Sequence, residues 1–251
     1  MPNAVVTEYP MFEDALRYPW NGEQKLETLL IGGLLTLLGV VFVPILFVYG
    51  YLVRVVRRVA AGETSEPPPF GEWGELFVDG IAAFVVSVVY FLVPAIVVTA
   101  GALLFLLPVT AVEAAGPSAG GGLVAIVGLL LALLGVVVAV VLTFAALYLV
   151  PAAVAAFARS GRFGAAFSPS MLRPIAGDRR YATGWLVAVA VSLVVQIVAS
   201  VVAATGVGAI LVPFLLFYGY VAGAYAVGVG ISDIAIGAET DEEAASTGAP
   251  M

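Results

Sequence analysis

The sequence predicts an all-α protein, a polytopic transmembrane helix bundle, and two observations carry this prediction. The first is composition: 62% of the 251 residues are hydrophobic and 11% are charged, whereas a soluble domain is roughly 45–50% apolar and about 25% charged. The second is the distribution of charge, because uncharged stretches cover 28–53, 80–112, 114–158 and 181–232. Each stretch exceeds the roughly 20 residues that a helix needs to cross a bilayer.

These stretches divide into five predicted spans. The last stretch is too long for one crossing, since 1.5 Å per residue would give about 78 Å, so we place a turn at Gly206 and Gly208. The predicted spans are 28–53, 80–107, 123–150, 183–204 and 207–231. We expect three regions: a polar or amphipathic amino-terminal segment (1–27), one transmembrane domain with an internal repeat (28–235) and an acidic, disordered tail (236–251).

Two short segments outside the spans have amphipathic patterns. Phe12, Leu16 and Trp20 recur at every fourth position, which is typical of an interfacial helix, although Pro19 equally favours an irregular leader. Before the second span, residues 70–79 predict a short cytoplasmic surface helix. Its carboxylates are expected to form a solvated acidic face, with a cation or acid–base site as the alternative: Glu72, Glu75 and Asp79.

The residue inventory excludes several chemistries. Cysteine and histidine are absent, and no phosphate-binding loop motif occurs. Disulfides, thiolate nucleophiles, histidine-ligated metals and Ser–His–Asp triads are therefore excluded. A net charge of −7 argues against a nucleic-acid partner, because no broad basic surface is available. We expect no cofactor, no metal site and no enzymatic activity.

The basic residues indicate both an environment and an orientation. Lys25 is the only lysine, and arginine bias with an acidic tail suits a high-salt cytoplasm, or alternatively a GC-rich genome. With five spans, eight arginines lie on the side of loops 54–79 and 159–180, against Arg17 and Lys25 on the other. The positive-inside rule then predicts a cell-membrane protein with its N-terminus outside and its C-terminus in the cytoplasm. Five arginines near span ends are expected to contact anionic lipid headgroups: Arg54, Arg57, Arg58, Arg179 and Arg180.

Two segments far apart in the chain repeat one pattern. Residues 42–51 read FVPILFVYGY and residues 211–220 read LVPFLLFYGY, identical at six of ten positions. The repeat includes a Val-Pro pair, and interior proline kinks a helix. Four such prolines are candidate helix hinges, with fixed curvature as the alternative: Pro44, Pro94, Pro151 and Pro213.

The predicted spans carry no charged side chain, so their polar and small residues are the features left to interpret. Ser192, Gln196 and Ser200 share one helical face. They predict either a polar lining for a ligand or hydrogen bonding between helices. Stripes of small residues predict close helix packing, within one chain or in a homo-oligomer or partner complex. They include Gly128, Ala132, Gly135 and Ala139 in the third span and Gly219, Gly223, Ala226 and Gly230 in the fifth.

The segment 50–91 combines GYLVRVVRR, a proline-containing polar linker, FGEWGELFVDG and an apolar helix. With the preceding LLIGGLLTLLG and the later VPFLLFYGYVAGAYAVG, the chain resembles the archaeal membrane family called domain of unknown function 4013, over about residues 18–235. The resemblance implies a polytopic membrane protein from a halophilic archaeon. It brings no activity, ligand or catalytic residue.

Two function hypotheses follow. The first is a non-enzymatic protein that organises the membrane or envelope through lipids or partners. It rests on the missing catalytic residues and on the absence of charge inside the spans. The alternative is a passive permease, channel or lipid-handling protein with a site near the fourth and fifth spans, which the repeat, the prolines and Gln196 favour.

Overall fold

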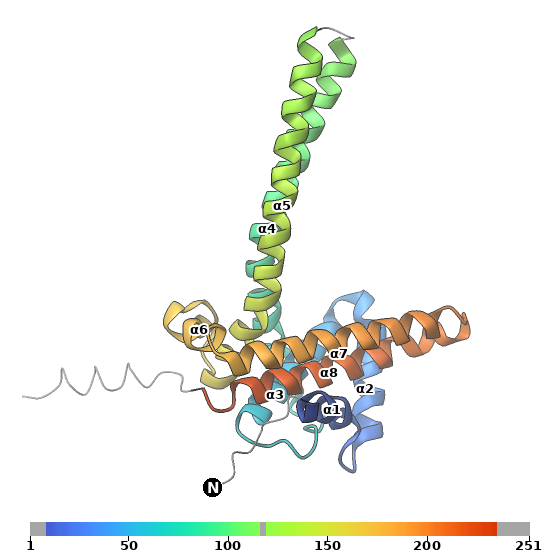
Figure 1. Ribbon diagram of the computed structural model, residues 1–251. Helices are drawn as coiled ribbons and strands as arrows, with labels where there is room; N and C mark the ends of the chain where they lie inside the picture. The colour runs from blue at the N-terminus through green and yellow to red at the C-terminus, as the bar shows by residue number, and fades with distance from the viewer. Residues whose placement is uncertain (1–8, 116–118, 235–251) are drawn as a thin grey trace, which may run out of the picture. The chain divides into compact units, whose positions relative to one another are not determined.

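The computed structural model describes residues 9–115 and 119–234, in which every regular element is helical. The prediction of an all-α protein is confirmed. Figure 1 shows the helices. Their bounds are α1 Tyr9–Arg17, α2 Lys25–Leu37, α3 Val43–Ala60, α4 Trp73–Ala115, α5 Ala119–Ser160, α6 Pro169–Ala176, α7 Arg179–Ala203 and α8 Val212–Ile231. Four short 3-10 helices join them: η1 Tyr18–Trp20, η2 Leu38–Val41, η3 Phe163–Phe167 and η4 Val207–Leu211.

Among the described residues, four segments are long and apolar enough to cross a membrane. They are Trp73–Leu103, Ile126–Ser160, Arg179–Ala203 and Val207–Ile231, and the bent pair Met11–Trp20 with Lys25–Val41 adds a fifth if it counts as one span. Large apolar side chains on these helices are exposed, including Leu130, Val141 and Ile197. Such faces suit a bilayer, because a soluble monomer rarely exposes so large an apolar surface.

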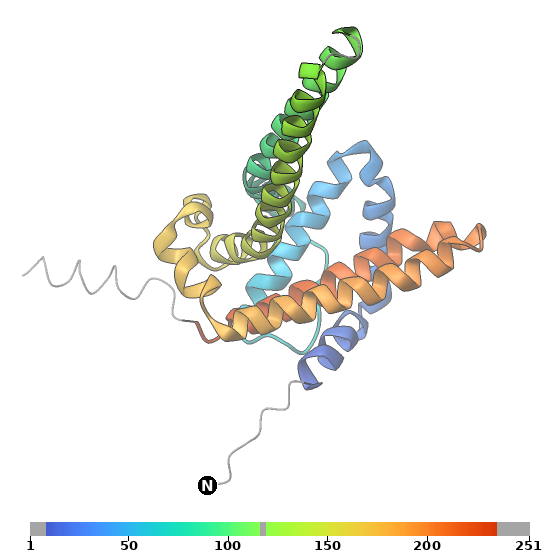
Figure 2. The ribbon, with the colours of Figure 1, turned by 45° about the horizontal axis from the view of Figure 1, so that its top comes forward.

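The first predicted span is the main difference from the sequence analysis. Residues 28–53 do not form one helix: α2 ends at Leu37, η2 follows, and Phe42 adopts φ 72° before α3 begins. Figure 2 shows α2 and α3 as the two arms of a hairpin. A positive φ at a bulky residue is uncommon. At Phe42 the positive φ reverses the direction of the chain, whereas the uninterrupted apolar run predicted one continuous helix.

The four candidate hinge prolines occupy two kinds of position. Pro44 and Pro213 lie in the first turns of α3 and α8, where the missing N–H costs no helical hydrogen bond. They are therefore not the interior kinks that the sequence suggested. Pro94 lies within α4 and Pro151 within α5.

Helix bounds elsewhere agree with the predictions more closely. The chain turns at Gly206, with φ 74°, as predicted between the last two spans. The third predicted span, 123–150, lies within α5, which continues past Pro151 to Ser160. The expected surface helix at 70–79 and the second span are instead one helix, α4, which begins at Trp73 and continues through Pro108.

The chain divides into two compact units, residues 85–150 and the remainder. In the smaller unit, α4 and α5 form an antiparallel hairpin whose backbones approach at Gly101 and Gly135. Beside this contact lies an apolar groove of about 420 Å³, lined among others by Val98, Gly101, Ala132, Gly135, Ala139 and Thr143. The small-residue stripe of the third predicted span therefore faces α4 of the same chain.

The larger unit is built around α8, which packs against α7, α3, α2 and α1. Its small residues meet α7 along the whole hairpin: a Cβ at Gly219 would touch Val195, at Gly223 Ala188 and at Gly230 the Arg180 carbonyl. Figures 1 and 2 show the two helices side by side. The second small-residue stripe thus packs within one chain, which the sequence left open.

Contacts along α8 define the directions of the α2–α3 hairpin. Gly32 lies against Phe217, whereas the ring centroid of Tyr18, which precedes α2, lies 4.5 Å from that of Tyr225. Helix α2 therefore runs antiparallel to α8. Tyr51 contacts Phe217 and Val59 lies against Gly228, so α3 runs parallel to α8. The chain therefore enters α2 and leaves α3 at the same end of the unit.

The amino-terminal segment forms the helix α1, but its apolar face is not free to enter an interface. Ala15 and Tyr18 are fully buried, and Phe12 and Leu16 pack against the core that α8 organises. Only Trp20, half exposed, retains the predicted interfacial character.

Helices α3 and α4 cross with their backbones in contact. A Cβ atom at Gly50 would clash with the Leu76 carbonyl oxygen, and one at Gly80 would clash with that of Leu46. Leu76 is completely buried at this crossing. Backbone atoms cannot move aside as a flexible side chain can, so this crossing requires glycine on both helices.

We expect Gly50→Ala to lower the free energy of unfolding by about 1–3 kcal/mol, as overpacking of a well-filled core does. Gly74→Ala is the matched control, since a Cβ there meets open space and alanine is favoured over glycine in a helix. Unfolding followed by circular dichroism in detergent micelles measures both. Equal stability of the two variants would contradict the backbone contact.

Candidate functional site

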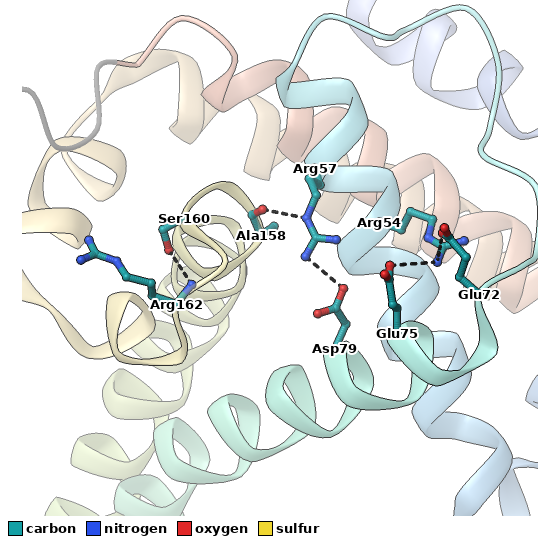
Figure 3. Close-up of polar contacts among 8 residues, drawn as sticks. All are labelled: Arg54, Arg57, Glu72, Glu75, Asp79, Ala158, Ser160 and Arg162. Carbon is teal, nitrogen blue, oxygen red and sulfur yellow. Dashed lines mark hydrogen bonds and ion pairs between the residues drawn. The ribbon is translucent and has the colours of Figure 1, made fainter.

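A cluster of charged side chains connects α3 with the start of α4, and we call it the arginine–carboxylate network. It consists of Arg54, Arg57, Glu72, Glu75 and Asp79 (Figure 3). The two arginines lie three positions apart on α3, and the carboxylates lie at intervals of three and four in the chain. Residues three or four apart share one helix face, so the two sets meet.

Arg54 is the most deeply buried charged residue among the described residues, at 8% exposure. Its Nη2 lies 3.1 Å from Glu72 Oε2 and 4.0 Å from Glu75 Oε2, and its Nη1 donates to the Gly71 carbonyl at 3.0 Å. A buried charge is tolerated when it is both paired and hydrogen-bonded. Arg54 meets both conditions.

Arg57 joins three helices through one guanidinium group. Its Nη2 donates to Asp79 Oδ2 of α4 at 3.0 Å, and its Nε donates to the Ala158 carbonyl in the last turn of α5 at 2.9 Å (Figure 3). Carbonyls of the last helical turn have no partner within the helix and carry partial negative charge. Arg57 therefore caps α5 while pairing with α4.

The linker between α3 and α4 is held down by side chains of the bundle. Tyr51 donates its hydroxyl to the Pro68 carbonyl at 2.8 Å, and Tyr18 donates to that of Glu66 at 3.1 Å. The Asn21 side-chain amide donates to the Ser65 carbonyl at 3.2 Å, so residues just before α2 contact the linker that follows α3. The Phe70 ring stacks on Tyr51 at 4.3 Å.

A second arginine caps α8. Arg159 donates from Nη1 to the Ile231 carbonyl at 2.8 Å and to the Ile234 carbonyl at 2.7 Å. Arg180, at the start of α7, pairs with Asp233. The ends of α5, α7 and α8 are therefore fixed to one another by charged side chains.

The predicted headgroup arginines have mostly found partners within the chain. Arg54, Arg57 and Arg180 form the contacts above, and Arg58 pairs with Glu63 at 3.4 Å. Only Arg179 among the five is exposed and without an ion pair in the described residues. The acidic face expected at residues 72–79 also differs: Glu72 and Glu75 stay exposed but pair with Arg54, and the Asp79 side chain is only 16% exposed.

The predicted polar stripe lies on the exposed face of α7. The Ser192 and Ser200 hydroxyls donate to the carbonyls of Ala188 and Gln196, each at 2.7 Å. Both hydroxyls are thus satisfied within α7, a common arrangement in apolar helices. The Gln196 side chain is exposed in the unit that contains it.

The arrangement stabilises helix ends and offers little for chemistry. No group of three metal-binding side chains occurs in the described ranges 9–115 and 119–234, and each carboxylate of the network faces an arginine. Sequence reasoning missed the capping by Arg57 and Arg159. The matching intervals of Arg54 and Arg57 with Glu72, Glu75 and Asp79 are the signal that could have revealed the network.

Comparison with known proteins adds one finding. Residues 33–204 match the family described as protein of unknown function DUF4013. The chain belongs to this family. The match covers the end of α2, all of α3 and the whole arginine–carboxylate network of this DUF4013 protein, but it carries no assigned activity. No curated protein and no solved structure matches the chain.

We expect Asp79→Asn to lower the free energy of unfolding by about 2 kcal/mol, because it removes a charged hydrogen bond to Arg57 in a half-buried place. Glu63→Gln, which removes the exposed partner of Arg58, serves as the control and should cost no more than about 0.5 kcal/mol. A double-mutant cycle of Asp79→Asn with Arg57→Gln measures the coupling. Additive effects would show that the pair contributes nothing.

Proposed function

We propose that this DUF4013 protein is a non-enzymatic integral membrane protein that organises the membrane or envelope through lipids or partner proteins. The observation that carries the proposal is the use of its charged groups. The arginine–carboxylate network, the Arg159 cap and the Arg180–Asp233 pair fix helix ends. A catalytic site instead keeps titratable groups accessible to a substrate.

The α2–α3 hairpin changes the orientation that the positive-inside rule supports. Because the chain returns to the end at which it entered, the segment before α2 and the linker after α3 belong on one side. With α4, α5, α7 and α8 as the spans, that side also holds loop 161–178 and the C-terminus. All ten Lys and Arg residues then lie on it. We propose that both termini are cytoplasmic, in place of the N-outside arrangement expected from five spans.

The two hairpins also support an internal repeat. In each, a 3-10 helix precedes a Val-Pro pair that opens the returning helix, α3 or α8. The returning helices run parallel and touch at Val59 and Gly228, positions that the repeat makes equivalent because both follow their matched segments by the same interval. We interpret the α2–α3 and α7–α8 hairpins as copies of one unit. A haloarchaeal source, in which arginine bias and surface acidity are expected, is part of the same proposal.

The lipid-handling alternative is favoured by one specific observation, the apolar groove between α4 and α5. A groove of about 420 Å³ with a mainly apolar lining of glycine, alanine and valine can accept an acyl chain or a small apolar solute. Transport through it would require the groove to stay open, whereas an organising protein does not need it.

Cysteine labelling tests the proposed orientation, and the chain offers a clean background because it contains no native cysteine. We expect Ser118→Cys to react with a membrane-impermeant maleimide in intact cells, while Ser168→Cys and Thr7→Cys react only after lysis. Labelling of Thr7→Cys in intact cells would instead show that the N-terminus is outside and that the chain crosses the membrane an odd number of times. Labelling of Ser168→Cys would reverse the whole orientation.

Reconstitution separates the two functions. The organising function predicts that proteoliposomes with the full chain show no solute or lipid flux above empty vesicles. Clustering of a fluorescent anionic lipid should rise with protein content. Flux that is abolished by Gly135→Leu, which fills the groove, but not by Gly122→Leu, where a Cβ meets open space, would instead establish the alternative.

A further inference from the structure

The arginines of the described residues divide into two groups by their partners. Six are engaged by the chain itself: Arg17, Arg54, Arg57, Arg58, Arg159 and Arg180. The remaining three, Arg162, Arg173 and Arg179, are exposed and take part in no ion pair within residues 9–115 and 119–234. Among the described residues, the arginine charge without an ion pair is therefore concentrated on these three side chains.

All three lie between the end of α5 and the first residue of α7, in a segment that we call the connector and define as residues 161–179. It contains η3 and α6, and it follows Ser160 and leads into α7 directly (Figure 2). Both flanking helices are long and apolar enough to span a bilayer. A short segment between two such helices must lie at one membrane surface, which places its charges at headgroup level.

The connector is fixed on one side and open on the other. Ala166 and Ile175 are completely buried and attach it to the protein, while Phe163 is 44% exposed beside Arg162. The rings of Phe163 and Phe167 meet at 5.3 Å. Arginine next to an exposed aromatic ring on an attached segment is typical of a surface that contacts the membrane interface.

We propose that Arg162, Arg173 and Arg179 bind the phosphate groups of anionic phospholipids in the cytoplasmic leaflet, with the Phe163 ring entering the headgroup region. The inference rests on the proposed topology and names the lipid class that the protein organises. Guanidinium groups bind phosphate through paired N–H donors. Arg54 and Arg57, expected from sequence to do this, already donate to partners in the chain.

Two other anions could occupy the same guanidinium groups: free phosphate, or the carboxylates of Glu239, Asp241, Glu242 and Glu243, which lie outside the described residues. A lipid is favoured because the surface combines charge with an exposed phenyl ring at membrane level. Neither free phosphate nor an acidic segment supplies apolar surroundings for that ring.

The experiment compares two triple variants of the full chain by native mass spectrometry in detergent, titrated with phosphatidylglycerol or phosphatidylcholine. Arg162→Gln, Arg173→Gln and Arg179→Gln together remove the unpaired charges. Arg17→Gln, Arg58→Gln and Arg180→Gln together remove the same charge from exposed ion pairs. Helical content and melting temperature confirm that both variants fold.

We expect the first triple variant to bind phosphatidylglycerol far more weakly than the wild type, by about fivefold for each arginine. Phosphatidylcholine binding and the control variant should stay within about twofold. Equal losses in both variants, or no loss in the first, would overturn the proposal. Displacement of the lipid by inorganic phosphate at constant ionic strength, or tighter lipid binding after deletion of residues 238–251, would assign the surface to those anions instead. A wrong topology would appear separately, in the cysteine labelling at position 168.

Discussion

The contact between Arg57 and its two acceptors is the interaction that attaches α4 and α5 to the rest of the larger unit. One guanidinium group fixes the start of α4 through Asp79 and the end of α5 through the Ala158 carbonyl. It can reach Asp79 because Gly50 and Gly80 let α3 and α4 cross with their backbones in contact. A side chain at either glycine would separate the helices and pull Asp79 away from Arg57. Charge pairing and close packing therefore depend on each other here.

The same physical logic explains why so many arginines lie near helix ends. The last carbonyls of an apolar helix need donors, and near a membrane water supplies them only at the surface. Arg57 supplies a donor to α5 and Arg159 to α8, with Arg180 paired to Asp233 beside them. Most of the arginines near the helix ends therefore have partners within the chain. Among the described residues, the arginines without an ion pair, Arg162, Arg173 and Arg179, lie between the end of α5 and the first residue of α7.

Hydrophobicity and spacing predicted most of the fold and less of the site. The apolar lengths of α4, α5, α7 and α8 and the turn at Gly206 follow from uncharged runs and glycine. The break at Phe42 could not be predicted in this way. Nothing in an apolar run shows that a bulky residue will adopt a positive φ where the chain reverses direction. The arginine–carboxylate network could not be predicted either. From the sequence, Arg54 and Arg57 are expected to contact lipid, but the crossing of α3 and α4 brings Asp79 to Arg57. Long-range pairing of this kind is decided by packing, which a single sequence does not display.

The proposed topology depends on the chain entering α2 and leaving α3 at the same membrane face. Spin labels at Glu23→Cys and Thr64→Cys test it directly in the otherwise cysteine-free chain reconstituted into nanodiscs. Both positions are exposed, and Asn21 touches Ser65 in the structure. Pulsed electron paramagnetic resonance should give a label separation below about 20 Å. A separation of about 30 Å or more, the thickness of a bilayer core, would show that residues 28–53 cross the membrane once. That result would contradict the proposed hairpin topology.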